Sequence, residues 1–298
     1  MRKSLDGYLP TPLFDEIRAV PDLDPAETAG KRTILGYGTG RCGMNWFHRI
    51  LAAHANATGG CERFSDFEVF YRYFHYHNLP VDMGGFHALL KKLRNYDWSR
   101  ADISVIYSPY FDFGMAGLVG ELNPEAVFFH IRKPEDAVNS MWVKGWYKGD
   151  YLLADPAKAP GPQPLTLPFY HHNFGRIMPS GPYFEEWRGM TRIGRIAWFY
   201  VEANTGMLAQ HRTFGDKAWT VRLQDVDQNY DYYVHMAETL GLAPLLGREE
   251  FLALKGSTTN AGKTRRSTDD WSKQERAEFE KVAGPFLDVY DSLKTTGL

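Results

Sequence analysis

The sequence predicts a three-layer α/β fold in which a central, mostly parallel sheet carries helices on both faces. Short apolar runs rich in β-formers alternate along the chain with segments of helical spacing. A glycine cluster joins the first such run to the first such helix, and a second strand–turn–helix unit follows later in the chain. This alternation is typical of β–α–β units, which place their strands parallel.

Composition limits the classes of function that fit the chain. The protein has 298 residues, of which 44% are hydrophobic and 23% charged, so we expect a single domain over residues 1–298 with a sizeable core. Its net charge is −2, so a fold-wide field that would attract nucleic acid or an anionic membrane is absent. Any anion-binding site must therefore be local.

The cysteines and the N-terminal residues bear on the compartment. Cys42 and Cys61 are the two cysteines in the sequence, which is too few for a disulfide framework and gives no metal-ligand spacing. Residues 1–6 lack the apolar core of a secretory signal, and no run of about 18 apolar residues predicts a membrane span. We expect a cytoplasmic protein without a metal ion.

The elements follow from local pattern, in chain order. Residues 1–30, rich in Pro, Asp and Glu, predict an irregular N-terminal arm. Strands are expected at residues 32–35, 103–107, 126–131 and 218–223. Helices are expected at residues 45–54, 86–93, 135–142, 195–210, 230–240 and 272–293.

Residues 145–194 interrupt this alternation with Pro, Gly, Tyr, His and Trp. A long irregular stretch inside a compact domain is usually a lid or a binding loop. We interpret this segment as the region that recognises an acceptor substrate. The alternative is a surface excursion without a function.

The first strand–helix junction is a glycine loop with Gly36, Gly38, Gly40 and Gly43, and it contains Arg41. Glycines let the backbone approach an anion closely, and the free N–H groups at the helix start point at it. The guanidinium adds a fixed positive charge suited to phosphate or sulfate oxygens. The loop predicts an anion site of the phosphate-loop (P-loop) type, and the alternative is a tight turn with a surface arginine.

Several phosphate-binding chemistries compete for this loop. A nucleoside triphosphatase needs Lys-Ser or Lys-Thr after the last glycine, and neither follows Gly43. The string Gly38-x-Gly40-x-x-Gly43 satisfies the dinucleotide fingerprint, with Glu62 near the expected acidic position. An NAD(P)-dependent oxidoreductase is therefore an alternative. Against it, residues 56–61 form a poor second strand.

The loop resembles that of sulfotransferases that use 3′-phosphoadenosine 5′-phosphosulfate (PAPS). The resemblance implies that loop amides and Arg41 bind the 5′-phosphosulfate and that Trp46 stacks on adenine. Met44 and Asn45 replace the usual hydroxyl pair, so a non-catalytic nucleotide-binding module is a further alternative. The resemblance implies donor contacts for Gly40, Arg41, Cys42, Gly43, Met44, Asn45 and Trp46.

A second motif lies at the end of the strand predicted at residues 126–131. Arg132 ends that strand, and Ser140 lies two helical turns further on, so both side chains can reach one phosphate. The segment from Arg132 to Ser140 resembles the R-[N/D]-P-x-D-x-x-x-S motif of the same family. The resemblance implies that these two residues hold the 3′-phosphate.

A basic cluster precedes the last predicted helix. It resembles the family loop that closes over the 3′-phosphate, which implies donor contacts for Lys263, Arg265 and Arg266. The alternative is a solvated run of charges.

The resemblance also implies the chemistry. In one branch of the family, bacterial and tyrosylprotein-like, a Glu at the position of Glu62 is the general base, and Arg41 stabilises the transferred group. Ser108 is expected to contact the sulfuryl group or its donor oxygen. His171 and His172 are the alternative bases.

Residues 64–78 and 145–190 are rich in aromatic side chains and predict the acceptor pocket. We expect Phe64, Tyr71, His171 and His172 to line it. The resemblance implies transfer of a sulfuryl group from PAPS to a hydroxyl or amine of a small or medium-sized acceptor, with adenosine 3′,5′-bisphosphate (PAP) as product. The sequence does not specify the acceptor or the oligomeric state.

Overall fold

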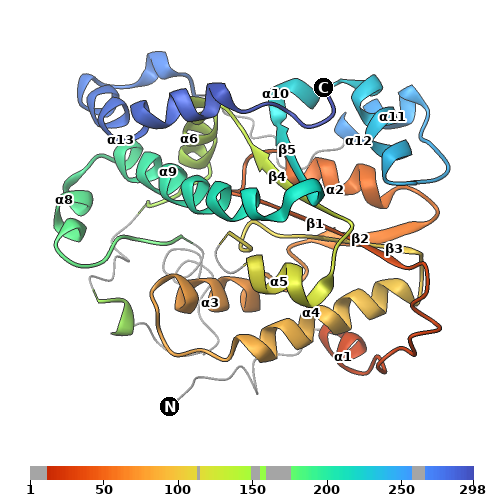
Figure 1. Cartoon of the computed structure of the whole chain (residues 1–298). Coiled ribbons are helices and arrows are strands. Elements are labelled where there is room, and N and C mark those ends of the chain that lie inside the picture. Colours follow the sequence, from red (N-terminus) through yellow and green to blue (C-terminus); the bar gives the residue numbers. More distant parts are fainter. Residues whose placement is uncertain (1–11, 113–114, 149–154, 159–175, 257–265) are drawn as a thin grey trace.

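The computed structural model describes residues 12–112, 115–148, 155–158, 176–256 and 266–298. Within these ranges the chain folds around one central sheet with helices on both faces (Figure 1).

The sheet has five strands in the order β2-β3-β1-β4-β5. All four neighbouring pairs are parallel. The predicted α/β fold with a parallel central sheet is confirmed. The strands are β1 (Arg32–Gly38), β2 (Ala57–Cys61), β3 (Ile103–Tyr107), β4 (Ala126–Ile131) and β5 (Ala218–Arg222).

Helices precede, connect and follow the strands. The α-helices are α1 (Pro12–Arg18), α2 (Met44–Ala52), α3 (Ser65–Tyr76), α4 (Met83–Trp98), α5 (Met115–Leu122), α6 (Pro134–Val143), α8 (Tyr183–Gly189), α9 (Arg192–His211), α10 (Leu223–Val226), α11 (Tyr230–Thr239), α12 (Arg248–Gly256) and α13 (Lys273–Ser292). The 3₁₀ turns are η1 (Pro156–Lys158), η2 (Arg212–Lys217) and η3 (Thr268–Asp270).

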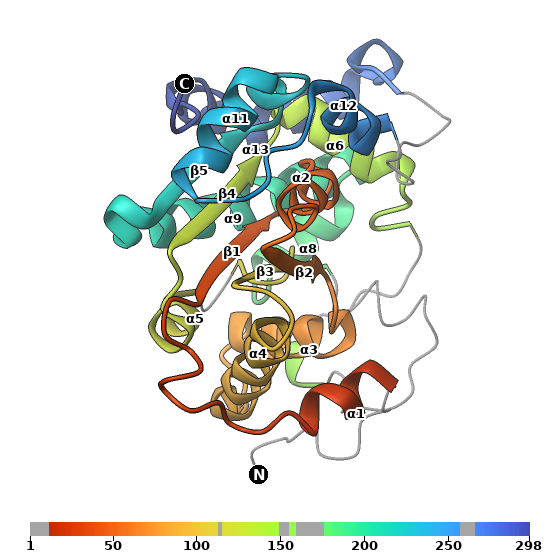
Figure 2. The same ribbon diagram turned by 90° about the vertical axis from the view of Figure 1, so that its right-hand side faces the viewer.

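Alternate residues of each strand enter separate cores on the two faces of the sheet. Leu35 and Phe129 pack into the core shared with α3, α4, α6, α9 and α13. Ile34 and Phe128 point the other way, into the core shared with α2, α11 and α12. Figure 2 shows the sheet between α1, α3 and α4 on one side and α2, α11 and α12 on the other. Buried parallel strands read as continuous apolar runs for this reason.

The expectation that residues 56–61 make a poor strand is wrong. Residues Ala57–Cys61 form β2, the edge strand that pairs with β3. A Cβ atom placed on Gly59 would lie 1.9 Å from the carbonyl oxygen of Val105, and φ of Gly59 is 153°. Glycine is therefore required for the close pairing, although glycine is also what lowers the strand propensity of the segment.

Two segments expected to be irregular contain helices. Residues 12–18 of the N-terminal arm form α1, and Ile17 from this helix is fully buried in the core. Within residues 145–194, α8 and the first turn of α9 are helical; Trp187 is buried and the Thr191 side chain accepts a hydrogen bond from the backbone N–H of Gly194. Burial of one apolar face fixes helices that composition alone does not indicate.

Candidate active site

The predicted site residues that follow the strands meet at one edge of the sheet. Arg41 follows β1, Glu62 follows β2, Ser108 follows β3 and Arg132 follows β4. Because all these strands are parallel, their carboxyl ends lie at the same edge, where ligands bind in open α/β sheets.

The glycine loop presents the start of α2 to this edge. Gly43 is the N-cap residue, with φ of 93°, and as a glycine it has no side chain that could cap the first amides of the helix. A Cβ at this position would lie 2.5 Å from Cδ1 of Leu223, so the loop needs glycine here. The backbone N–H groups of Trp46 and Phe47 bond to the carbonyl of Gly43. The earlier amides of the helix start are suited to an anion.

Arg41 joins the loop to the second predicted motif. Its Nε donates to Oγ of Ser140 at 3.0 Å. Nη1 of Arg132 donates to the carbonyl oxygen of Arg41 at 3.4 Å. Burial, and next the positive charge of Arg132, lower the pKa of Arg41. Two guanidinium groups and a hydroxyl thus share one region, and charge-assisted donors grouped in this way suit a phosphate or sulfate.

The strand end and the start of α6 hold Arg132. The hydroxyl of Tyr200 donates to its carbonyl oxygen at 2.7 Å, and Asp136, one turn along, lies 4.0 Å from Nη2. Its side chain remains 30% exposed, so the guanidinium can meet a ligand. Pro134 opens α6, where its missing N–H costs nothing.

Glu62, at the end of β2, lies near enough to Arg41 for the two charges to interact. Its backbone N–H donates to the carbonyl of Tyr107 at 2.9 Å, which extends the ladder between β2 and β3 by one residue. Burial raises the pKa of Glu62, and the charge of Arg41 lowers it in part. The carboxyl therefore lies within electrostatic reach of Arg41.

Both Arg41 and Glu62 hold left-handed backbone conformations, with φ of 60° and 57°. Such conformations are unfavourable for residues with a side chain, and they persist where the surrounding structure imposes them, often at functional sites. Two predicted site residues share this feature at one edge of the sheet.

Ser108 is completely buried, and its hydroxyl is engaged within the protein. Its Oγ donates to Oε2 of Glu68 at 2.6 Å and accepts from the backbone N–H of Tyr110 at 3.1 Å. The predicted contact of Ser108 with a sulfuryl group stays a prediction. Glu68 was missed at the sequence level, although a carboxylate among the aromatic residues of α3 is a usable signal.

Three other residues of the glycine loop are buried. Cys42 and Met44 are 1% and 4% exposed, and burial raises the pKa of the Cys42 thiol to about 12. Trp46 is 5% exposed, and its ring meets Phe251 of α12 edge-on at 5.9 Å. The predicted stacking of adenine on Trp46 stays a prediction. Asn45 is half-buried and lies in the first turn of α2.

Two aromatic residues predicted to line the acceptor pocket lie in the core. Phe64 is 4% exposed and precedes α3, with its ring near that of Phe67. Tyr71 is 5% exposed and stacks on Phe86 of α4 at 4.6 Å. Their contact with an acceptor stays a prediction.

Part of the predicted basic cluster is paired. Nη2 of Arg266 donates to both carboxylate oxygens of Glu275, at 2.9 and 3.0 Å. Its guanidinium also lies 3.9 Å from the ring centre of Trp142 in α6. The ion pair and the ring contact hold the start of the C-terminal segment against α6. The predicted residues Lys263, Arg265, His171 and His172 lie outside the described residues.

Trp146 lies beside the glycine loop, and Arg176 lies against its ring. A Cβ placed on Gly40 would lie 3.7 Å from Cζ2 of Trp146, so the indole reaches the loop. Arg176 lies 4.8 Å from the ring centre of Trp146, and the Phe199 ring meets that indole edge-on at 5.0 Å. The sequence pointed to the segment that contains these residues but to neither one individually.

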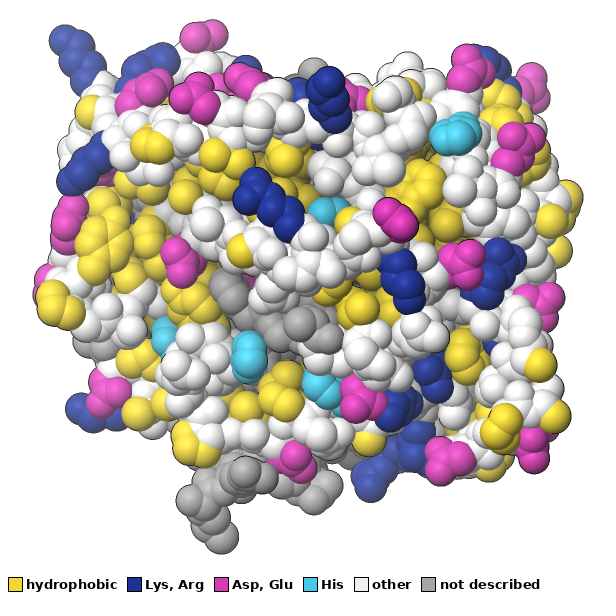
Figure 3. All heavy atoms as spheres, viewed as in Figure 1, with side chains coloured by type: hydrophobic (Ala, Val, Ile, Leu, Met, Phe, Trp, Pro, Cys, Tyr) yellow, Lys and Arg dark blue, Asp and Glu magenta, His cyan; other side chains and the backbone are white. Residues whose placement is uncertain are grey.

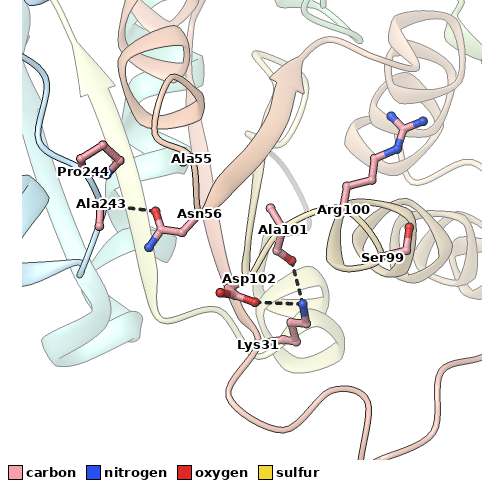
Figure 4. Close-up of a pocket in the computed structure, with 9 residues that line it drawn as sticks. All are labelled: Lys31, Ala55, Asn56, Ser99, Arg100, Ala101, Asp102, Ala243 and Pro244. Atoms are coloured by element: carbon pink, nitrogen blue, oxygen red, sulfur yellow. Dashed lines mark hydrogen bonds and ion pairs between the residues drawn. The ribbon is translucent and has the colours of Figure 1, made fainter.

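A solvent-open hollow lies at the opposite edge of the sheet, where β1, β2 and β3 begin (Figure 4). Lys31 donates to Asp102 at 3.0 Å and to the carbonyl of Ala101 at 3.1 Å. Asn56 accepts from the backbone N–H of Ala243 at 2.9 Å. These polar groups bond to the protein itself, and the described residues that line the hollow include no pair of neighbouring guanidinium groups such as Arg41 and Arg132 form at the carboxyl edge.

The surface, the helices and the arrangement of possible metal ligands add three observations. Figure 3 shows Lys and Arg side chains interspersed with Asp and Glu over one face, in keeping with the near-neutral net charge. Over the described ranges, no helix combines the length and the apolar character that a bilayer crossing requires. In the same ranges, no three His, Cys, Asp or Glu side chains gather in a way that could hold a metal ion.

Comparison with known proteins finds similarity in structure alone. No family model matches the chain, and no curated protein does. The crystal structure of sulfotransferase STF9 from Mycobacterium avium superposes with a TM-score of 0.50 at 10% identity, covering 92% of this chain and 81% of that one. A sulfotransferase from Alicyclobacillus acidocaldarius gives a TM-score of 0.46 at 11% identity, covering 89% of this chain and 98% of that one. The match to the Mycobacterium avium protein shows that this chain shares its fold.

Proposed function

We propose that the protein is a PAPS-dependent sulfotransferase that transfers a sulfuryl group to a hydroxyl or amine of a small or medium-sized acceptor. One observation carries the proposal: Arg41, Ser140 and Arg132 form a continuous cationic region beside the glycine loop. The fold shared with a sulfotransferase from Mycobacterium avium agrees with it. The two motifs come from separate β–α units, and a doubly phosphorylated adenosine is a ligand that needs both.

The donor would bind with its two phosphate-bearing ends on these motifs. The loop amides at the start of α2 and the Arg41 guanidinium suit the 5′-phosphosulfate. The partly exposed guanidinium of Arg132 and the hydroxyl of Ser140 suit the 3′-phosphate. Arg266, with Lys263 and Arg265, would close over the nucleotide from the C-terminal side.

The reaction needs a base, a positioned donor and stabilisation of negative charge. Glu62 would take the acceptor proton while the acceptor oxygen or nitrogen attacks sulfur in line. The bond between sulfur and the 5′-phosphate oxygen then breaks, and PAP leaves with the electron pair. Arg41 would offset the charge that develops on the oxygens of the transferred group and the leaving phosphate. Glu62 lies within electrostatic reach of Arg41, as this division of roles requires.

The strand order argues against the oxidoreductase alternative. The dinucleotide-binding fold places its second strand beside the first, so that the acidic residue at its end meets the ribose of the nucleotide. Here β3 separates β2 from β1. Glu62 is therefore two strand spacings, roughly 10 Å, from the glycine loop in the plane of the sheet. That position suits a group facing the transferred sulfuryl better than a ribose ligand.

A binding comparison tests the proposal. PAP should raise the melting temperature of the protein, and NADH should not, since the 3′-phosphate is the feature that Arg132 recognises. Replacement Arg132→Ala should weaken PAP binding about 10- to 100-fold, because a hydrogen bond to a charged group contributes roughly 1.5–3 kcal/mol. The exposed neighbour Lys133 provides the matched control, Lys133→Ala. Binding of NADH in preference to PAP would overturn the proposal.

Turnover with labelled PAPS and a panel of phenols, alcohols and amines then separates an enzyme from a non-catalytic module. PAP binding without transfer to any acceptor would favour the module.

A further inference from the structure

Glu68 is a buried carboxyl with a hydroxyl group as its partner. The residue is 2% exposed, and its Oε2 lies 2.6 Å from Oγ of Ser108, which is itself completely buried. The backbone N–H of Tyr110 donates to the same Oγ. Glu68 lies six residues after Glu62, on the first turns of α3, so the two carboxyls meet at the same edge of the sheet.

The arginines nearest to Glu68 in the chain are committed to aspartates. Arg63 donates to both oxygens of Asp97, at 2.7 Å each. Arg72 donates to both oxygens of Asp112, at 2.8 and 2.5 Å. Each pair is bidentate, so the guanidinium forks point at the aspartates. The charge of Arg63 still acts on Glu68 from a distance and lowers its pKa in part.

The other ionisable groups that face Glu68 would add negative charge. They are Glu62 at the end of β2, Cys61 within β2, and Tyr110 after β3. A buried carboxylate surrounded by acids and balanced pairs is costly to ionise. Two carboxyls in such a setting separate into one that ionises and one that keeps its proton.

We propose that Glu68 keeps its proton in the working enzyme and is a positioning residue that holds the Glu62–Glu68 pair at a single negative charge. This inference rests on the proposed function for the role of Glu62, whereas the protonation of Glu68 is a property of the folded chain alone. Burial raises the pKa of Glu68 to about 8, and the charge of Glu62 raises it further. The hydrogen bond from Ser108, the charge of Arg63 and a hydrogen bond with the backbone of Phe64 lower it without cancelling the effect of burial. A second negative charge here would oppose binding and transfer of the anionic sulfuryl group.

The protonation can be tested without a ligand. Below its ordinary value of 4.5 the carboxyl is protonated in folded and unfolded chains alike, and between 4.5 and about 8 the folded chain alone keeps the proton. Stability therefore falls as pH rises through this window, and Glu68→Gln removes that contribution. We expect the melting temperature of the variant, relative to wild type, to rise by about 4 °C or more from pH 5 to pH 8. Glu280→Gln on the exposed face of α13 is the charge-matched control. An equal difference at both pH values would overturn the proposal.

The effect on transfer is measured as kcat/KM against pH. Wild type should lose about tenfold between pH 7 and pH 9 as Glu68 ionises, and Glu68→Gln should lose less than about twofold over the same range. Ser108→Ala removes a hydrogen bond that lowers the pKa of Glu68, so the alkaline loss of kcat/KM should move to higher pH. A merely structural defect would lower kcat/KM without shifting this pH. Parallel profiles for wild type and both variants would overturn the role in transfer.

The outcomes separate the two proposals. Absence of transfer in wild type at every pH, with the stability difference present, would sink the sulfotransferase function and leave the protonation intact. Transfer in wild type with identical melting shifts for Glu68→Gln and Glu280→Gln would sink the protonation and leave the function intact. Should Glu68→Gln fail to fold, the Ser108→Ala profile decides, since an unmoved alkaline loss contradicts the proposal.

Discussion

The two edges of the same sheet differ in how their polar groups are satisfied. At the amino edge, Lys31 donates to the carboxylate of Asp102 and to the carbonyl of Ala101, and Asn56 accepts from a backbone N–H. At the carboxyl edge, two guanidiniums lie together, and Arg41 and Glu62 hold left-handed backbone conformations. The carboxyl edge therefore combines grouped cations with strained charged residues, a combination that is found where a protein acts.

Glu62→Gln should give the largest effect, and it tests most directly whether the carboxyl edge is where the protein acts. We expect kcat for sulfuryl transfer to fall by about 10²- to 10⁴-fold, because a general base contributes on that order. Asp102→Asn at the amino edge is the control of equal charge change. An unchanged kcat for Glu62→Gln would remove this residue as the base and point to another group.

The charges of Glu62 and Arg41 together predict a pH shift. Burial raises the pKa of Glu62, and Arg41 lowers it in part. Arg41→Ala should therefore raise this pKa and move the acid limb of the kcat/KM profile to higher pH, because the carboxylate is protonated at a higher pH than in wild type.

Arg41→Ala should rank next in size. The guanidinium bonds to Ser140 and has Arg132 as a neighbour, so its loss removes one of two cations from the region. Affinity for PAP, measured by titration calorimetry, should fall about 10- to 100-fold. Lys31→Ala at the opposite edge should leave that affinity within about twofold of wild type. Equal losses for both variants would mean that the carboxyl edge is not the donor site.

Gly43→Ala tests the backbone conformation of the glycine loop at the carboxyl edge. The added methyl group would meet Leu223 at 2.5 Å, and φ of 93° is strained for alanine. We expect a loss of about 1–3 kcal/mol in the free energy of unfolding, seen as a lower midpoint in urea. Gly181→Ala, where φ is 72° and no atom lies within 4 Å of the added Cβ, separates backbone strain from the clash. Equal losses at the two positions would mean that the contact with Leu223 adds nothing.

Much of the carboxyl edge could be predicted from the sequence, because it depends on short-range pattern. The apolar runs of β1, β3, β4 and β5 mark fully buried strands, and polar residues that follow them are placed at one edge by parallel topology. Arg41 and Arg132 were found this way. The glycine-rich strand β2 was not, since its pairing depends on the close approach to Val105, which no local pattern reports.

Long-range packing determines the side-chain contacts that could not be predicted from the sequence. The burial of Trp46 depends on Phe251, which lies on a helix some 200 residues away in the chain. The pairing of Arg266 with Glu275 and the contact of Ser108 with Glu68 are likewise properties of the assembled fold. Residue type indicated the chemistry available at these positions, whereas the partner of each residue came from tertiary structure.

The smallest expected effect belongs to the ion pair at the amino edge. Lys31 and Asp102 are 21% and 65% exposed, so water and salt screen their attraction. Lys31→Met should change the free energy of unfolding by less than about 1 kcal/mol, with the loss shrinking further in high salt. Thermal melts at low and high ionic strength measure it, and PAP binding should be unaffected in both. A large effect on PAP binding would show that the two edges are coupled through the strands, since β1 runs from Lys31 to the glycine loop and is the direct structural link between them.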